Sequence, residues 1–194
     1  MKIGITGFST SGKTTLANLL AKHFNAERCS ADDFYFVNET HFCEINGKRV
    51  PDWDNPQAIN WDVFEKKVSN CHNILIFVDS HILFYSKNMI DLIDALILLE
   101  YTPNDYENAL KRRIKRQYNE DVPKDYQLNP FASEASFEAM YFQEIAWKKA
   151  IANPEYVDPI PWKKPIIKIP ASLSMELVFE QAKTFVQQTL ENKY

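Results

Sequence analysis

The sequence predicts an α/β fold of three layers, in which a five-stranded parallel sheet carries helices on both faces. Three observations support this prediction. A short apolar segment at residues 2–6 runs into a glycine-rich loop and then into an amphipathic helix. Strand-like and helix-like segments alternate along the rest of the chain. Aspartates follow two of the strand-like segments, where parallel sheets place their ligand-binding residues.

The glycine-rich loop GFSTSGKTT, residues 7–15, matches the phosphate-binding pattern GxxxxGK[ST] at every fixed position. Its glycines let the backbone turn tightly around phosphates, and the next helix presents its positive end to the same anion. We expect Lys13 to reach the β- and γ-phosphates of a nucleoside triphosphate and the Thr14 hydroxyl to bind Mg²⁺. The predicted nucleotide-binding residues are Gly7, Ser9, Thr10, Ser11, Gly12, Lys13, Thr14 and Thr15.

Length and composition limit the other possibilities. The 194 residues, 45% of them hydrophobic, fit one domain over residues 1–194. The net charge of −4 disfavours a nucleic-acid partner, and no apolar run approaches the roughly 18 residues that span a membrane. Cys29, Cys43 and Cys71 are too far apart for a redox or zinc pair and are expected to be reduced thiols. We therefore expect a cytoplasmic protein that binds small molecules.

Carboxylates mark the ends of two predicted strands. The strand at residues 27–30 is followed by Asp32 and Asp33, at the sheet edge where α/β proteins bind ligands. Either aspartate could instead cap a turn. The buried strand at residues 74–78 ends at Asp79, which has the form of a Walker B acid that helps hold Mg²⁺. No glutamate follows Asp79, which disfavours an ATP-hydrolysing motor.

Residues 34–54 form a predicted insertion on the acceptor side of the site. Asn46-Gly47 between two short β-prone segments is a strong hairpin signal. The insertion ends in Trp53 and Asp54, where an indole could stack on a planar ring and a carboxylate could bind sugar hydroxyls. Asp54 could equally be the N-cap of a helix that runs to about Asn70.

A basic helix is predicted to start at Thr102-Pro103, after a strand at residues 95–99. Arg112 and Arg116 are four residues apart and share a face, so their guanidinium groups could clamp phosphates during transfer. Arg113 and Lys115 are expected on a solvated face.

The C-terminal third completes the predicted fold. Residues 119–132 form a loop long enough to close over the nucleotide as a small lid. An amphipathic helix follows at residues 133–150, then a proline-rich connection, a fifth strand at residues 166–169 and a final helix.

Several segments together resemble nicotinamide riboside kinase, in the uridine kinase-like branch of the P-loop kinases. They are GFSTSGKTTLA, Asp32 to Tyr35, Trp53-Asp54, ILIFVDSHILF from Ile74 to Phe84, and KRRIKRQY from Lys111 to Tyr118. The resemblance implies a P-loop kinase fold with Asp32 as the base or orienting group for a 5′-hydroxyl. It also implies Tyr35 in the substrate segment, Trp53 at the pyridine ring, Asp54 at the ribose hydroxyls and Asp79 near Mg²⁺.

The chain also departs from that family. Asp79-Ser80 stands where the family has Glu-Gly, and the lid lacks the family's glycine and aromatic pattern, which leaves Tyr118 and Tyr126 as alternative stacking residues. The Asn46-Gly47 hairpin is closer to uridine kinases. We expect an ATP- and Mg²⁺-dependent kinase that converts nicotinamide riboside to nicotinamide mononucleotide. The alternatives are a uridine or cytidine kinase and, from another class, a non-catalytic nucleotide-binding module.

Overall fold

The computed structural model describes residues 1–36 and 41–192 and divides the chain into two compact units. Unit 1 contains Met1–Tyr35, Ile59–Tyr101 and Pro154–Tyr194. Unit 2 contains Phe36–Ala58 and Thr102–Asn153. Unit 2 therefore combines most of the predicted acceptor-side insertion with the basic helix, the predicted lid and the helix after it.

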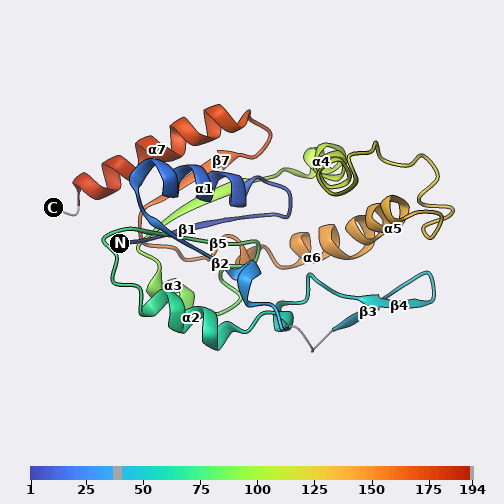
Figure 1. Ribbon diagram of the computed structural model, residues 1–194, viewed down its shortest axis with the longest axis horizontal. Coiled ribbons are helices and arrows are strands. Elements are labelled where there is room, and N and C mark those ends of the chain that lie inside the picture. The colour runs from blue at the N-terminus through green and yellow to red at the C-terminus, as the bar shows by residue number, and fades with distance from the viewer. Residues whose placement is uncertain (37–40, 193–194) are drawn as a thin grey trace. The chain divides into compact units, whose positions relative to one another are not determined.

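Unit 1 is built on a parallel sheet of five strands in the order β2-β5-β1-β6-β7 (Figure 1). The strands are β1 (Lys2–Gly7), β2 (Glu27–Ser30), β5 (Ile76–Ser80), β6 (Ala95–Glu100) and β7 (Ile166–Pro170). The prediction of a five-stranded parallel sheet is confirmed. Because all strands run the same way, the loops after β1, β2 and β5 emerge at one edge of the sheet.

Helices cover both faces of this sheet, which gives the three predicted layers (Figure 1). On one face α1 (Lys13–Phe24) and α7 (Met175–Glu191) share a core with Ile5 and Phe77. On the other face Phe64 of α2 (Trp61–Ser69) and Met89 of α3 (Asn88–Leu92) pack in a second core with Val78. Phe77 and Val78 lie on opposite faces because successive strand residues alternate.

The start of α2 decides one alternative left open by the sequence. Asn60 is its N-cap, and the Asn60 side chain accepts a hydrogen bond from the Val63 N–H at 3.2 Å. The interpretation of Asp54 as the cap of this helix is therefore wrong, because Asp54 lies six residues before Asn60. The short helix α3 was not predicted, since five residues are too few to show helical periodicity.

Unit 2 begins with the predicted hairpin, formed by β3 (Phe42–Ile45) and β4 (Lys48–Pro51). Asn46 and Gly47 connect the strands with φ angles of 48° and 75°. Two successive positive φ angles are what a type I′ turn requires, so the hairpin prediction is confirmed. Residues 37–40 of the predicted insertion lie outside the described residues.

The helices of unit 2 are α4 (Tyr106–Tyr118), α5 (Glu134–Tyr141) and α6 (Trp147–Ala152). A capping box between Thr102 and Asp105 opens the short 3₁₀ helix η3 (Pro103–Asp105) before α4. Between α5 and α6 the π-helical turn η4 (Phe142–Ala146) interrupts the single helix predicted over residues 133–150. Residues 119–133 contain no helix or strand, as the loop prediction requires.

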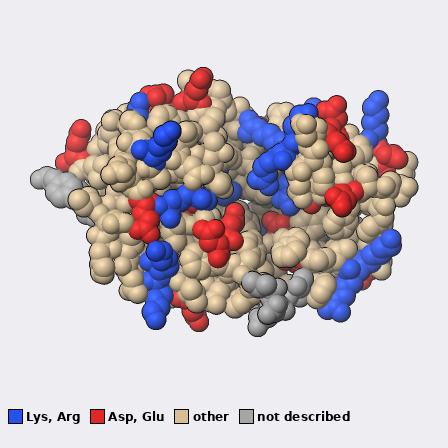
Figure 2. All heavy atoms as spheres, in the orientation of Figure 1, with Lys and Arg blue, Asp and Glu red and all other residues tan. Residues whose placement is uncertain are grey.

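Short 3₁₀ helices complete the two units: η1 (Ala31–Phe34), η2 (Pro56–Ala58) and η5 (Pro154–Tyr156). Lys and Arg side chains gather over α4 on the face drawn in Figure 2, and acidic and basic side chains are interspersed elsewhere on it. In residues 1–36 and 41–192, no helix is both long enough and apolar enough to cross a membrane.

Candidate functional site

The glycine-rich loop of unit 1 adopts the backbone that its sequence predicts. Gly7 and Gly12 have φ angles of 146° and 97°. A Cβ atom on Gly7 would lie 2.4 Å from the carbonyl oxygen of Leu99, so only glycine fits there. Gly12 stands at the N-cap of α1 and provides no side-chain cap, which leaves the first amides of the helix directed at the loop.

Lys13 and Ser11 lie inside this loop. The Lys13 ammonium donates a hydrogen bond to the Phe8 carbonyl oxygen at 2.9 Å, and its side chain is buried. The buried Ser11 hydroxyl has no hydrogen-bond partner in the described part of the chain. A buried hydroxyl without a partner and uncapped helix amides are costly unless an anion binds them, so the loop fits a phosphate chain. Thr14 and Thr15 are exposed at the start of α1.

Tyr101 supports the loop from the end of β6, and sequence reasoning missed it. Its hydroxyl donates to the Thr10 carbonyl oxygen at 3.0 Å, and its ring meets Phe8 edge to face at 6.3 Å. Thr10 has a φ of 70°, a costly conformation for threonine, which the bond from Tyr101 helps to hold. The sequence could have indicated this role, because Tyr101 directly follows β6, and β6 pairs with β1, the strand that leads into the loop.

Asp32 and Asp33 lie on the 3₁₀ helix η1, directly after β2, and both are exposed. The cap of this helix is Ser30, whose hydroxyl accepts from the Asp32 N–H at 3.4 Å. The interpretation of either aspartate as the cap is therefore wrong, and both carboxylates are presented at the carboxyl edge of the sheet. Tyr35, half-buried, forms an antiparallel bridge with Ile59 just beyond.

Asp79 is the penultimate residue of β5, near the same edge, and its carboxylate is almost fully buried. The Arg28 Nε donates to Oδ1 at 2.8 Å, Arg28 Nη2 donates to Oδ2 at 3.1 Å, and the Ser30 hydroxyl donates to Oδ2 at 3.1 Å. Burial alone would lower the pKa of Arg28. The hydrogen bonds and charge of Asp79, with the charges of Asp33 and Asp32, outweigh it and raise that pKa.

The described residues limit how Mg²⁺ could be held. Among residues 1–36 and 41–192, no group of three or more His, Cys, Asp or Glu side chains could bind a metal ion. Mg²⁺ needs no such group in a kinase, since it is commonly held by substrate phosphates with one or two protein oxygens. The exposed Thr14 fits that arrangement, and the role of Asp79 at the metal stays a prediction.

Trp53 and Asp54 belong to unit 2. The Asp54 N–H donates to the Tyr141 hydroxyl at 3.0 Å, and that hydroxyl donates to buried Asp52 at 3.4 Å. Lys149 forms an ion pair with Asp52. The segment is thus fixed by α5 and α6, while the Trp53 side chain remains 54% exposed. Burial, followed by the charge of Asp54, raises the pKa of Tyr141, so its hydroxyl stays neutral.

Arg113 is the least exposed arginine of α4, so its assignment to a solvated face is wrong. Its side chain is 11% exposed and pairs with Glu138 of α5, which is 9% exposed. Burial would lower the pKa of Arg113, but the charges of Asp54 and Glu138 raise it. Glu138 is itself buried and lies one turn before the buried Tyr141 on α5.

The other predicted residues of unit 2 lie on its surface or within its loop. Arg112 and Arg116 are exposed on α4. Tyr126 is buried and donates a hydrogen bond to Gln143 at 2.7 Å, whereas Tyr118 is half-buried. Tyr118 is the more accessible of the two candidate stacking residues.

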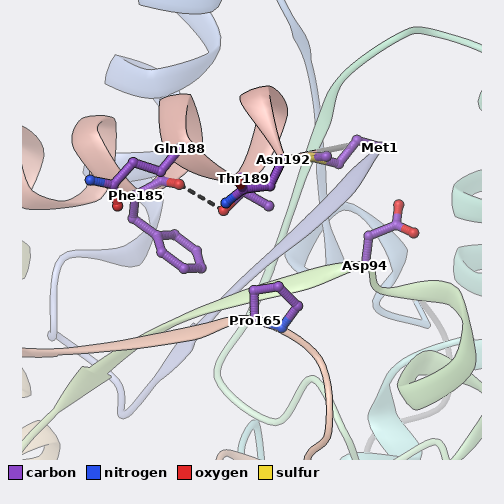
Figure 3. Close-up of a pocket in the computed structure, with 7 residues that line it drawn as sticks. All are labelled: Met1, Asp94, Pro165, Phe185, Gln188, Thr189 and Asn192. Atoms are coloured by element: carbon purple, nitrogen blue, oxygen red, sulfur yellow. Dashed lines mark hydrogen bonds between the residues drawn. The ribbon is translucent and has the colours of Figure 1, made fainter. Parts of the chain in front are cut away.

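A separate hollow lies at the opposite end of the sheet (Figure 3). It is lined by Met1, Asp94, Pro165, Phe185, Gln188, Thr189 and Asn192. Met1, Asp94 and Pro165 directly precede strands, so this hollow is at the amino ends of the strands, away from the glycine-rich loop. The Lys2 N–H donates to Asp94 and the Thr189 hydroxyl donates to the Phe185 carbonyl oxygen, both at 2.7 Å. These polar groups therefore make hydrogen bonds within the protein.

The three cysteines form no disulfide, as predicted. Cys29 is buried in the second core, and burial raises the pKa of its thiol to about 12. Such a thiol is a structural group and takes no part in the site.

Comparison with solved structures gives the fold. A gluconokinase from Sinorhizobium meliloti aligns with a TM-score of 0.59 at 13% identity, covering 100% of this chain and 95% of that one. A shikimate kinase from Acinetobacter baumannii aligns with a TM-score of 0.52 at 13% identity, covering 99% and 94%. This chain has the P-loop kinase fold. At these identities the P-loop kinase structures show the fold alone.

Sequence comparison adds one relative, and no family model matches the chain. A uridine kinase from Schizosaccharomyces pombe is 27% identical over 146 residues, which cover 60% of this chain. The chain spans about a third of the length of that relative, 32%.

Proposed function

We propose that this protein is an ATP-dependent kinase that transfers the γ-phosphoryl group to the 5′-hydroxyl of a ribonucleoside. The observation that carries the proposal is the shared edge of unit 1, where the phosphate-binding loop after β1 and Asp32 after β2 both emerge. A phosphoryl donor site and an exposed carboxylate at one sheet edge are what transfer to an alcohol requires.

In this proposal each residue of unit 1 has a distinct role. ATP would supply the phosphoryl group when bound, with Mg²⁺ on its phosphates. Lys13 would neutralise charge that develops on the transferred group, and the amides of residues 7–15 would hold the phosphate chain. Asp32 would orient the 5′-hydroxyl and accept its proton. Arg112 and Arg116 of unit 2 are proposed to contribute positive charge, and residues 119–132 to exclude water as a lid.

Nicotinamide riboside is the acceptor that we propose first. The resemblance assigns Trp53 to the pyridinium ring and Asp54 to the ribose hydroxyls. The fixed backbone of Asp54 and the exposed indole of Trp53 suit such a recognition surface. Uridine or cytidine is the second candidate, and the 27% identical uridine kinase favours it.

A nucleoside panel tests this proposal. Purified protein is incubated with ATP, Mg²⁺ and each of nicotinamide riboside, nicotinic acid riboside, uridine, cytidine and adenosine, and the monophosphate products are separated by chromatography. The proposal predicts a nucleoside monophosphate from at least one acceptor, with nicotinamide riboside giving the highest kcat/KM. ATP binding without any phosphorylated product would instead establish a non-catalytic nucleotide-binding module.

Two neighbouring variants sharpen the same assay. Asp32→Asn should lower kcat by about 10² to 10⁴-fold while nucleotide affinity is retained, because the change removes only proton acceptance from the hydroxyl. Asp33→Asn makes the same change one residue further along and should retain most of the activity. Equal losses in the two variants would remove Asp32 from its proposed role.

A further inference from the structure

Arg28 holds the aspartate that the sequence assigns to the metal ion. The register pairs Arg28 with Phe77 and Ser30 with Asp79 on the neighbouring strands β2 and β5. Arg28 and Ser30 are two residues apart, so both side chains point to the same face of the sheet. From there the two side chains make the three hydrogen bonds to the Asp79 carboxylate described above.

This arrangement leaves the carboxylate little capacity for another cation. A carboxylate offers about four lone-pair directions, and the guanidinium and hydroxyl donors use three of them. The Asp79 side chain is 2% exposed, whereas the Arg28 side chain is 24% exposed. Arg28 is therefore the partner that can move toward solvent. A fixed positive charge at the carboxylate also opposes the approach of a divalent cation.

We propose that Arg28 is a positioning residue that orients the Asp79 carboxylate and competes with the divalent metal ion for it. The inference rests on the proposed function, because the metal ion would arrive with the nucleotide. Its consequence is that nucleotide phosphates and Thr14 supply most of the metal binding, with Asp79 restrained by Arg28. A purely structural role would instead limit Arg28 to joining β2 to β5.

The test measures how strongly the metal ion and the nucleotide assist each other's binding. Calorimetry gives the affinity for the non-hydrolysable ATP analogue AMP-PNP with Mg²⁺ and with EDTA. The ratio of these two affinities is the coupling factor. Arg28→Met keeps the aliphatic stem and removes the charge, so we expect the coupling factor to rise on the order of tenfold. Arg28→Lys keeps the charge and should leave the coupling factor near the wild-type value.

A double variant identifies the group through which Arg28 acts. When Arg28→Met is combined with Asp79→Asn, the coupling factor should no longer rise, because the variant has no Asp79 carboxylate to release for the metal ion. An unchanged or lower coupling factor in Arg28→Met would overturn the proposal, and so would an equal gain in the Asp79→Asn background. Thermal unfolding of each variant measures separately how much Arg28 stabilises the protein by joining β2 to β5.

This experiment separates the inference from the proposed function. Nucleotide affinity in EDTA reports on the protein's own contacts with the nucleotide without the metal ion, and no acceptor is needed. A wild-type protein that does not bind AMP-PNP would overturn both proposals. A wild-type protein that binds it, with no rise in the coupling factor of Arg28→Met, would overturn only the role of Arg28. If Arg28→Met does not fold, Arg28→Gln replaces it with the same expected rise.

Discussion

The phosphate-binding loop of unit 1 and the ion pairs of unit 2 hold charge by different physical means. In the loop, backbone amides and a helix N-terminus provide the positive potential, and the charged side chain Lys13 donates to the carbonyl oxygen of Phe8 in the same loop. In unit 2, Arg113 pairs with Glu138 and Lys149 pairs with Asp52, so charged side chains from three helices and the insertion neutralise one another.

This difference predicts different consequences of mutation. Backbone amides keep their positions when one side chain of the loop is changed, so substitutions there should affect ligands more than folding. A buried ion pair behaves in the opposite way, because removing one partner leaves the other charged and desolvated. The first two predictions below test this contrast, in order of the expected free-energy change.

The largest effect is expected at the buried pair of unit 2. Arg113→Met leaves the Glu138 carboxylate buried without its partner, which should destabilise the protein by about 3 to 5 kcal/mol. Thermal and urea unfolding, followed by tryptophan fluorescence, measure this loss. Lys111→Met makes a similar charge change at an exposed position of the same helix and should alter stability by less than about 0.5 kcal/mol.

A compensating variant distinguishes an unpaired charge from lost packing. In Arg113→Met combined with Glu138→Leu, both charges are gone, and most of the lost stability should return because buried ion pairs are often replaceable by apolar side chains. If the double variant is as unstable as Arg113→Met alone, packing and not charge explains the loss. An Arg113→Met variant as stable as wild type would contradict the contrast itself.

The loop should show the reverse pattern. Lys13→Ala removes the cation proposed at the γ-phosphoryl group and should lower kcat/KM on the order of 10²-fold or more. Its unfolding temperature should stay close to the wild-type value, because the Lys13 ammonium donates its hydrogen bond to Phe8 of the loop itself, and the loop backbone does not depend on that side chain. Steady-state kinetics with the best acceptor of the panel, and thermal unfolding on the same preparation, measure both. Wild-type turnover in the folded variant would refute the phosphate-binding assignment.

The same contrast explains which parts of the molecule the sequence could reveal. The loop, the five strands and the Asn46-Gly47 hairpin depend on local chemistry: glycine backbones, apolar runs and a turn that needs positive φ angles. These predictions are confirmed. Asp32 was correctly placed just after a strand, whereas Asp79, expected directly after a strand at residues 74–78, is the penultimate residue of β5 (Ile76–Ser80).

Pairs of distant residues were missed for the opposite reason. Arg28 meets Asp79 across 51 positions of sequence, and Arg113 meets Glu138 across 25. A charged residue is buried only where the fold brings a partner close to it. The sequence neighbours of Arg113 are mostly charged or polar, so they predict an exposed side chain. The π-helical turn at Phe142–Ala146 likewise arises within a helical pattern that showed no local interruption.

The smallest effect concerns the exposed indole of unit 2 and the identity of the acceptor. A pyridinium ring gains a cation–π interaction from Trp53, and since that side chain is 54% exposed the gain should be near 0.5 to 1 kcal/mol. Trp53→Leu should therefore raise KM for nicotinamide riboside by about two- to fivefold and leave KM for uncharged nicotinic acid riboside and uridine nearly unchanged. Asp54→Ala is the matched control and should weaken every ribonucleoside alike, by about 1 to 3 kcal/mol, because ribose hydroxyls are common to all of them. An equal rise in KM for charged and uncharged acceptors in Trp53→Leu would show that the indole acts only as a wall, and would favour the pyrimidine nucleosides as substrates.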